Sequence, residues 1–328
     1  MPKRTSKSDN NAKRMRTRIA VTLGDPRGIG PEVAFQAVAG ELPPGVDLTF
    51  FGSDALGPQV PAGCDFVSVG GFDGSEQDAG NVSVLAIQRA VESAMRGEYR
   101  ALVTAPVSKP ALRAAGRDVP GQTELLQQLT GCESVGMLMA AERTRLGSPL
   151  RVLLATTHYA LRDVPEMVTT DLLADQAELL CAALRRDWKI DKPRLALCAL
   201  NPHASDGGLF GDEEARVFEP AVQRAESAGV DLSGPHPADT VFQRALAGHF
   251  DAVIAPYHDV GMAAFKTVSF GGGVNVTLGL PFVRTSPDHG TAFDIAGTGR
   301  ADASSMREAL RLAQQLSSAR FDTDSVDV

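Results

Sequence analysis

The stretch RIAVTLGDPRGIGPEVAFQAV, residues 18–38, contains the unit from which the fold is built. It opens with RIAVTLG, a short and almost continuously apolar run that is typical of a strand buried on both faces. It closes with PEVAFQAV, which is typical of a helix, and the glycine-rich turn GDPRGIG separates the two. A buried strand followed by a covering helix is the repeating unit of a parallel sheet.

The same alternation continues along the chain. Further strand-like runs are VDLTFFG, ALVTA, LRVLLATT, RLALCAL, DAVIAPY and VNVTLGL. Helical patterns occur in NVSVLAIQRAVESAM, TELLQQLTG, TDLLADQAELLCAALRRD, DEEARVFEPAVQRAESAG, ADTVFQRAL and SSMREALRLAQQL. We therefore predict an α/β protein that is two-lobed, with largely parallel sheets covered by helices. Residues 1–17 are predicted to be a disordered basic tail, and residues 18–328 a single two-lobed catalytic unit with the active-site cleft between its lobes.

Composition excludes several classes of function. The net charge of −8 argues against a nucleic-acid surface, which needs a basic stripe. No apolar stretch approaches the roughly 20 residues of a membrane span, and the basic N-terminal segment has no hydrophobic core like that of a secretory signal. The four cysteines are far apart and form no CxxC pair, which disfavours a disulfide framework and a cysteine zinc site. These features predict a cytoplasmic protein that binds neither nucleic acid nor a membrane.

Three of the six histidines, His158, His203 and His258, each follow an apolar strand-like run. A lone histidine at such a place is usually a hydrogen-bonded loop residue. Three of them, each near an aspartate or asparagine, favour a site for one divalent metal ion, because imidazole is a common ligand and usually needs an outer acceptor. The ligand type suits zinc, nickel, cobalt or iron, with manganese and magnesium as further candidates.

A conventional dinucleotide site is disfavoured. The Rossmann string G-x-G-x-x-G does not occur in the chain, and no lysine-serine or lysine-threonine pair follows a glycine-rich loop as a Walker motif requires. Residues 288–305, DHGTAFDIAGTGRADASS, instead resemble the adenosine-binding loop of isopropylmalate and isocitrate dehydrogenases. The resemblance implies a fold like theirs rather than a conventional Rossmann fold, with NAD held by His289, Gly290, Thr291, Ala292, Asp294, Ile295 and Gly297. The alternative is a glycine-rich turn before the last helix.

Longer motifs extend the resemblance over nearly the whole chain. They include GDPRGIGPEV, TAPVSKPAL, PGQTELL, TTHYALRDV, LNPHASDGGLFGDEE, GPHPADTVF and the run from YHDVGM to FDIAG. In this order they resemble the 4-hydroxythreonine-4-phosphate dehydrogenase family of pyridoxine biosynthesis.

The family likeness implies a homodimer with a shared active site and assigns roles to single residues. His158, His203 and His258 match its metal ligands, which come from both subunits. The matching substrate-binding positions are Gln122, Thr123, Lys109, Lys266, Asn275 and Arg284. Lys266, Asp259 and Asp239 are the candidates for proton transfer, and the sequence does not rank them.

The implied reaction is an NAD-dependent and metal-dependent oxidation of a secondary hydroxyl followed by decarboxylation, with 4-phosphohydroxy-L-threonine as the substrate. Gln122 stands where the family usually has histidine, and a neutral amide donates a weaker hydrogen bond to phosphate than a charged histidine does. Erythronate or threonate 4-phosphate, or a carboxylated cis-dihydrodiol such as terephthalate dihydrodiol, therefore stay open as substrates. A non-redox protein that binds a phosphate ligand, or resembles an acyltransferase, is the remote alternative.

Overall fold

The computed structural model describes residues 16–40, 44–269 and 271–322 and contains one sheet of eleven strands. The strand order is β3-β2-β1-β4-β11-β10-β5-β6-β9-β7-β8. All neighbouring pairs are parallel except β11–β10, β10–β5 and β5–β6. The predicted α/β class with largely parallel strands is confirmed, and the antiparallel strands lie in the middle of the sheet.

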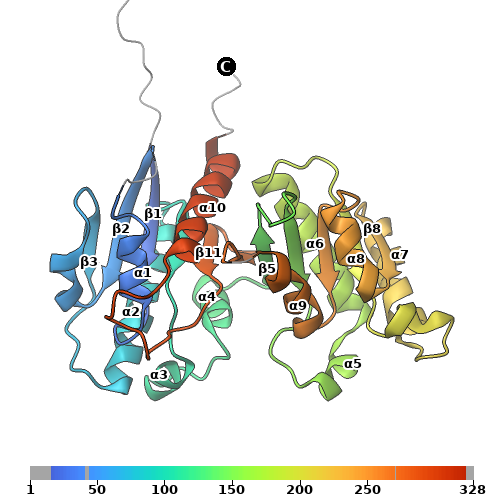
Figure 1. The fold of residues 1–328 in the computed structure, drawn as a ribbon, viewed down its shortest axis with the longest axis horizontal. Helices are drawn as coiled ribbons and strands as arrows, with labels where there is room; N and C mark the ends of the chain where they lie inside the picture. Colours follow the sequence, from blue (N-terminus) through green and yellow to red (C-terminus); the bar gives the residue numbers. More distant parts are fainter. Residues whose placement is uncertain (1–15, 41–43, 270, 323–328) are drawn as a thin grey trace, which may run out of the picture.

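One end of the sheet comes from the first part of the chain (Figure 1). Its strands are β1 (Thr17–Thr22), β2 (Val46–Gly52), β3 (Asp65–Ser68) and β4 (Ala101–Thr104). Its helices are α1 (Gly30–Gln36), η1 (Asp54–Gln59), α2 (Glu76–Met95), α3 (Lys109–Ala114) and α4 (Gln122–Thr130). Residues 1–15 of the predicted tail lie outside the described residues, and Thr17 already belongs to β1.

The other end comes from the second part of the chain. Its strands are β5 (Gly136–Ala141), β6 (Leu150–Leu154), β7 (Arg194–Cys198), β8 (Asp231–His236) and β9 (Ala252–Ala255). Its helices are η2 (Leu161–Asp163), α5 (Val164–Met167), α6 (Thr170–Asp187), η3 (Pro202–Asp206), η4 (Glu214–Phe218), α7 (Glu219–Ser227), α8 (Ala238–Leu246) and α9 (His258–Ser269). None of the described helices is long and apolar enough to cross a membrane.

The C-terminal part of the chain joins the two ends. Strands β10 (Val274–Leu278) and β11 (Val283–Pro287) form an antiparallel pair; β11 continues the parallel set beside β4, and β10 pairs with β5. Helix α10 (Ser304–Phe321) packs on β11, as Figure 1 shows near the centre of the molecule. Side chains on β10 and β11 therefore lie between the two ends of the sheet. In open α/β sheets, ligands commonly bind at the carboxyl ends of the parallel strands.

Candidate active site

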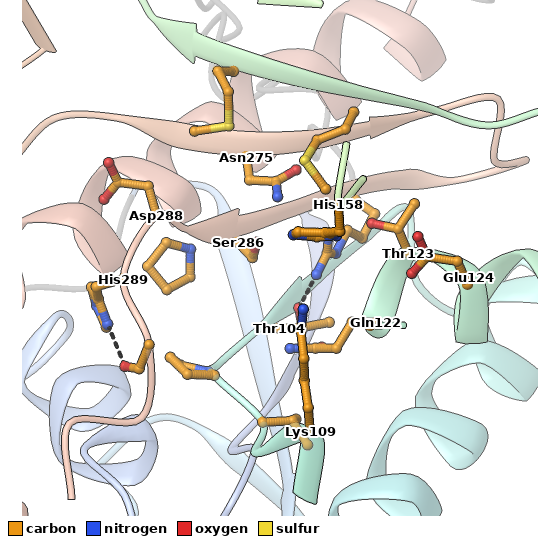
Figure 2. Close-up of a pocket in the computed structure, with 18 of the residues that line it drawn as sticks. Thr104, Lys109, Gln122, Thr123, Glu124, His158, Asn275, Ser286, Asp288 and His289 are labelled. Carbon is orange, nitrogen blue, oxygen red and sulfur yellow. Dashed lines mark hydrogen bonds between the residues drawn. The ribbon is translucent and has the colours of Figure 1, made fainter. Parts of the chain in front are cut away.

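A cavity of about 280 Å³ lies at the middle of the sheet, lined by residues from both of its ends (Figure 2). The lining combines the end of β4 and the first turns of α3 and α4 with side chains of β5, β10, β11 and α9. Four of the eight buried side-chain atoms that have no hydrogen-bond partner among the described residues belong to residues lining this cavity: Gln122 Oε1, Asn275 Oδ1, Arg284 Nε and His289 Nε2. Buried polar atoms are nearly always paired in proteins, so this concentration indicates a place for a polar ligand.

Arg284 is the most unusual residue of the cavity. It lies on β11 with only 2% of its surface exposed, and its terminal nitrogens donate to the hydroxyls of Thr277 (2.9 Å) and Thr104 (2.6 Å). Burial lowers the pKa of the guanidinium to about 10, and the negative charge of Glu124 acts in the opposite direction. No carboxylate of the described chain forms an ion pair with it, although a buried charge is normally paired. An anionic ligand would supply the missing partner.

Other predicted substrate residues surround the same space. Lys109 begins α3, Gln122 and Thr123 begin α4, and Asn275 lies on β10; all four line the cavity. Lys109 is exposed and has no ion pair within the described residues. The structure thus brings these four predicted positions together in the lining of the cavity, to which Arg284 also belongs.

His158 and His258 meet at one side of the cavity. His158 follows β6 and His258 begins α9, and their ring centroids are 5.8 Å apart. The Nδ1 of His258 is hydrogen-bonded to Asp259 at 2.7 Å, which leaves Nε2 available. Burial lowers the pKa of His158, with a further contribution from the positive charge of Lys109. Two neighbouring imidazoles, one of them held by a carboxylate, fit a divalent cation.

His203 lies elsewhere, on the exposed turn η3. The described residues contain no group of three or more His, Cys, Asp or Glu side chains placed to hold a metal ion. Two of the three predicted ligands therefore come together within one chain, and the third does not.

The turn that carries His203 has an unusual backbone. Residues 203–206 all have positive φ angles, between 44° and 67°, although none of them is glycine. Such residues usually cost about 1 kcal/mol or more each. The buried carboxylate of Glu214 holds the turn by accepting hydrogen bonds from the backbone N–H groups of Leu200 (2.9 Å) and Asn201 (2.7 Å), from the Asn201 side chain and from the Ser205 hydroxyl. Burial alone would raise the pKa of Glu214, but these hydrogen bonds outweigh it and lower the pKa.

The three candidates for proton transfer do not line the cavity. Lys266 forms an ion pair with Asp288 at 2.8 Å and also donates to its backbone oxygen, so it reaches the cavity edge through that residue. Asp259 contacts His258, as described above. Asp239 is exposed in the first turn of α8, away from the cavity lining.

The predicted NAD loop begins at the cavity and leads away from it. His289 and Gly290 line the cavity, whereas Thr291, Ala292, Asp294, Ile295 and Gly297 continue toward α1. The Thr291 carbonyl accepts a hydrogen bond from Ile29 N–H at 2.9 Å, and a Cβ on Gly28 would lie only 2.8 Å from that oxygen. Gly297 N–H donates to Glu32 at 2.9 Å. The glycine-rich turn after β1 therefore supports the loop, a contact that the sequence did not reveal.

The exposed face of this loop fits a flat ligand. A Cβ at Gly290, Gly297 or Gly299 would meet no atom within 4 Å, so ligand could approach the backbone closely there. Phe293 is 48% exposed beside this backbone, with the Arg27 guanidinium 5.2 Å from its ring centroid.

Several residues of the cavity were not predicted from the sequence. They are chiefly Thr104, Glu124, Met137, Met139, Met262, Ser286 and Asp288. Only the position of Glu124 in the sequence could have identified it as a cavity residue, because it directly follows the predicted Gln122 and Thr123 at the start of a helix. The others become recognisable only when the central strands are brought together.

Comparison with known proteins gives consistent matches. A family model described as "Pyridoxal phosphate biosynthetic protein PdxA" matches residues 60–313. A 4-hydroxythreonine-4-phosphate dehydrogenase of Paracoccus denitrificans is 42% identical over 322 residues, covering 92% of this chain and 98% of that protein. The D-threonate 4-phosphate dehydrogenase of Salmonella typhimurium is 37% identical, with 91% and 98% coverage. The crystal structure of 4-hydroxythreonine-4-phosphate dehydrogenase from Klebsiella pneumoniae superimposes with a TM-score of 0.82 at 36% identity, covering 92% of this chain and 99% of that one.

Proposed function

The chain belongs to the PdxA family of pyridoxal phosphate biosynthetic proteins, and from this premise we propose that it oxidises a phosphorylated hydroxy acid with NAD and then decarboxylates the product. Its named relatives are dehydrogenases, so the chain is an oxidoreductase. The first candidate substrate is 4-hydroxythreonine-4-phosphate, and the second is D-threonate 4-phosphate, since relatives named for each match this chain over similar lengths.

The observation that carries the proposal is the buried and unpaired Arg284. Its Nε has no partner, and its other two nitrogens are held by threonine hydroxyls, so the guanidinium is already oriented toward one incoming group. A planar guanidinium suits a carboxylate or phosphate oxygen. Lys109, also at the cavity, adds a second positive charge for a substrate that carries two anionic groups.

The residues present fit both implied cofactors. His158 and His258 would hold a divalent cation, and residues 289–297 would hold NAD along the exposed loop. When bound, NAD accepts the hydride from the carbinol carbon, and the cation stabilises the negative charge on the substrate oxygen.

The side chains of the chain then have distinct tasks. Arg284 and Lys109 bind the anionic groups and thereby orient the hydroxyl carbon, which removes the entropy cost of alignment from the chemical step. The hydroxyl proton must leave to a base as the hydride departs. Lys266, which reaches the cavity edge through Asp288, is the best placed of the three predicted candidates, and it would accept this proton in its neutral form, after its own proton has passed to the Asp288 carboxylate. The resulting ketone lies β to the carboxylate, so the bond to that carboxylate can break with release of carbon dioxide, and the enolate that remains takes up a proton to give the ketone product.

We propose that a second copy of the chain supplies His203. This histidine is exposed on a turn that Glu214 holds in place, and the neighbouring Leu209 and Phe210 are 71% and 46% exposed. Exposed apolar side chains beside a prospective ligand are expected where another subunit docks. A homodimer with a shared active site would bring the third imidazole to His158 and His258.

The test is a substrate panel with purified protein, NAD and a divalent metal. We expect NADH and carbon dioxide to form in equal amounts with 4-hydroxythreonine-4-phosphate or D-threonate 4-phosphate, and to require the metal. Formation of NADH without carbon dioxide would remove the decarboxylation step. No turnover with either phosphorylated acid would contradict the substrate class, and terephthalate dihydrodiol would then be tested as the carboxylated, non-phosphorylated alternative.

A further inference from the structure

Lys266 is held at the edge of the cavity by one residue. Its Nζ lies 2.8 Å from Oδ2 of Asp288 and donates a second hydrogen bond to the backbone oxygen of Asp288 at 2.9 Å. The lysine side chain is 48% exposed, whereas that of Asp288 is 8% exposed, and Asp288 lines the cavity next to His289 (Figure 2). The position of the Lys266 amine therefore depends on how firmly Asp288 is fixed.

The first turn of α10 fixes Asp288. Ser305, which is 4% exposed, accepts a hydrogen bond from the Asp288 backbone N–H at 3.2 Å. Its hydroxyl oxygen lies 3.0 Å from Asp288 Oδ1 and also 3.0 Å from the carbonyl oxygen of Gly273. The hydroxyl has one hydrogen, and an ionised carboxylate is a stronger acceptor than a carbonyl, so this hydrogen is directed to Oδ1. Oδ2 is thereby left for Lys266.

The backbone of Gly273 packs closely against the same carboxylate. A Cβ at this position would lie 2.6 Å from Asp288 Oδ2 and 2.8 Å from the ring of Phe265, which is fully buried. The carboxylate therefore has no free space on this side. Ser305 and Gly273 together restrict it to one orientation, in which Oδ1 faces Ser305 and Oδ2 faces Lys266.

The Ser305 hydroxyl can hold Asp288 in both of its protonation states. In the proposed reaction an N–H bond of the Lys266 ammonium breaks and an O–H bond forms on the Asp288 carboxylate, before the amine takes a proton from the substrate. Ser305 then turns its hydrogen to the Gly273 carbonyl oxygen, which is as close as Oδ1, and still accepts the Asp288 backbone N–H. Asp288 therefore stays anchored during the transfer.

We propose that Ser305 is a positioning residue for the reaction, which acts through Asp288 to keep the Lys266 amine at the edge of the cavity. Ser305 is buried behind Asp288 and does not itself line the cavity. The inference rests on the proposed function for the task of Lys266, and on the described contacts for the geometry.

The first measurement needs neither substrate nor NAD. Acetic anhydride acylates exposed amines in their neutral form, and mass spectrometry gives the rate at Lys266 relative to the exposed Lys109 of the same sample. Ser305→Ala removes a donor from the ionised carboxylate, so the ion pair holds the ammonium less firmly, and the relative rate should rise roughly fivefold. Ser317→Ala is the matched control, because Ser317 is fully buried on the same helix and donates within it to Ala313; it should leave the rate unchanged.

A double variant tests whether Ser305 acts through Asp288. Asp288→Asn removes the charge that pairs with Lys266, so it should by itself raise the relative acylation rate at least as much as Ser305→Ala does. Adding Ser305→Ala to Asp288→Asn should then change the rate by less than about twofold, because the group through which Ser305 acts is already gone. Independent effects of the two substitutions, or an unchanged rate in Ser305→Ala, would overturn the proposal.

A second substitution keeps the test decisive if Ser305→Ala does not fold. Ser305→Cys is close in size and places a weak donor at the same point, so it should raise the relative acylation rate about threefold. A rate equal to that of the natural protein would again contradict the proposal.

Turnover provides the second readout. With 4-hydroxythreonine-4-phosphate and NAD, Ser305→Ala should lower kcat about fivefold to tenfold and change each KM by less than about twofold, because a displaced base affects the chemical step. A change confined to KM, or a fall in kcat that only matches the loss of folded protein in urea unfolding, would overturn the positioning role. No turnover of any substrate by the natural protein would refute the proposed function and leave the acylation result valid.

Discussion

Replacing Arg284 by methionine should remove ligand binding without destabilising the fold. Burial lowers the pKa of this guanidinium to about 10, and each tenfold change in acid strength corresponds to about 1.4 kcal/mol, so the buried cation is unfavourable by roughly 3 kcal/mol. The variant leaves the hydroxyls of Thr104 and Thr277 without their donor, at about 1 kcal/mol each. We therefore expect Arg284→Met to unfold with a free energy equal to that of the natural protein or about 1 kcal/mol higher.

Arg151 provides the matched control. It is also buried, at 8% exposure, but its guanidinium forms an ion pair with Glu142 at 2.6 Å. Removing one member of a buried pair strands the other charge, so Arg151→Met should lose about 3 kcal/mol or more. Urea unfolding of both variants gives the comparison.

The same experiment with added inorganic phosphate tests the ligand. Phosphate at 100 times its Kd should stabilise the natural protein and Arg151→Met by about 2.7 kcal/mol, and should not stabilise Arg284→Met. If Arg284→Met loses as much stability as Arg151→Met, or if phosphate stabilises all three proteins equally, the reasoning from an unpaired buried cation is refuted.

Three further predictions concern the metal, the His203 turn and the NAD loop. His158→Ala should abolish metal binding measured by calorimetry, while Asp259→Asn should weaken it about tenfold to 100-fold by replacing the charged acceptor of His258 with a neutral one; equal affinity in either variant would remove that residue from the metal site. Glu214 has a lowered pKa, so the stability it contributes is present above its unfolded pKa of about 4.3 and is lost as the pH falls through its folded pKa. Glu214→Gln should therefore make the free energy of unfolding depend less on pH in this acidic range. An unchanged slope of that free energy against pH would contradict the role of Glu214 in holding the His203 turn. Gly297→Val should raise the KM for NAD about tenfold because φ at Gly297 is +73°, with the metal Kd unchanged as the internal check.

The sequence could predict the α/β class because parallel strands covered on both faces leave apolar runs such as ALVTA, where every residue of β4 is buried. It could not predict which strands become neighbours in the middle of the sheet. Strands β10 and β11 are close in sequence and antiparallel, yet β11 then pairs with β4, far earlier in the chain. Such pairings depend on long-range packing, and they are what places Arg284 beside Thr104.

The helix predicted over DEEARVFEPAVQRAESAG illustrates a second limit. The structure divides it into the π-helical turn η4 and helix α7, with Pro220 in the first turn of α7. The spacing of apolar residues alone does not distinguish a π-helical turn from an α-helix. The π-helical turn η4 carries Glu214, and the reason for its shape lies in a distant segment, because the Glu214 carboxylate accepts hydrogen bonds from the turn η3 that carries His203 and from the residues just before it. The sequence identified His203 as a candidate ligand but held no signal for the residue that positions it.

The unpaired atoms around the cavity also restrict the shape of the ligand. A fold gains little from keeping Gln122 Oε1, Asn275 Oδ1 and Arg284 Nε buried without partners, since single apolar substitutions would remove each penalty. Two of these atoms accept hydrogen bonds and one donates from a cation. Inorganic phosphate offers mainly acceptors and can satisfy only the arginine, and a plain apolar acid leaves the two amides unpaired. A molecule that combines an anionic group with hydroxyl or ammonium donors satisfies all three atoms at once, so the polarity of the cavity favours an acid that carries such donors over either simpler ligand.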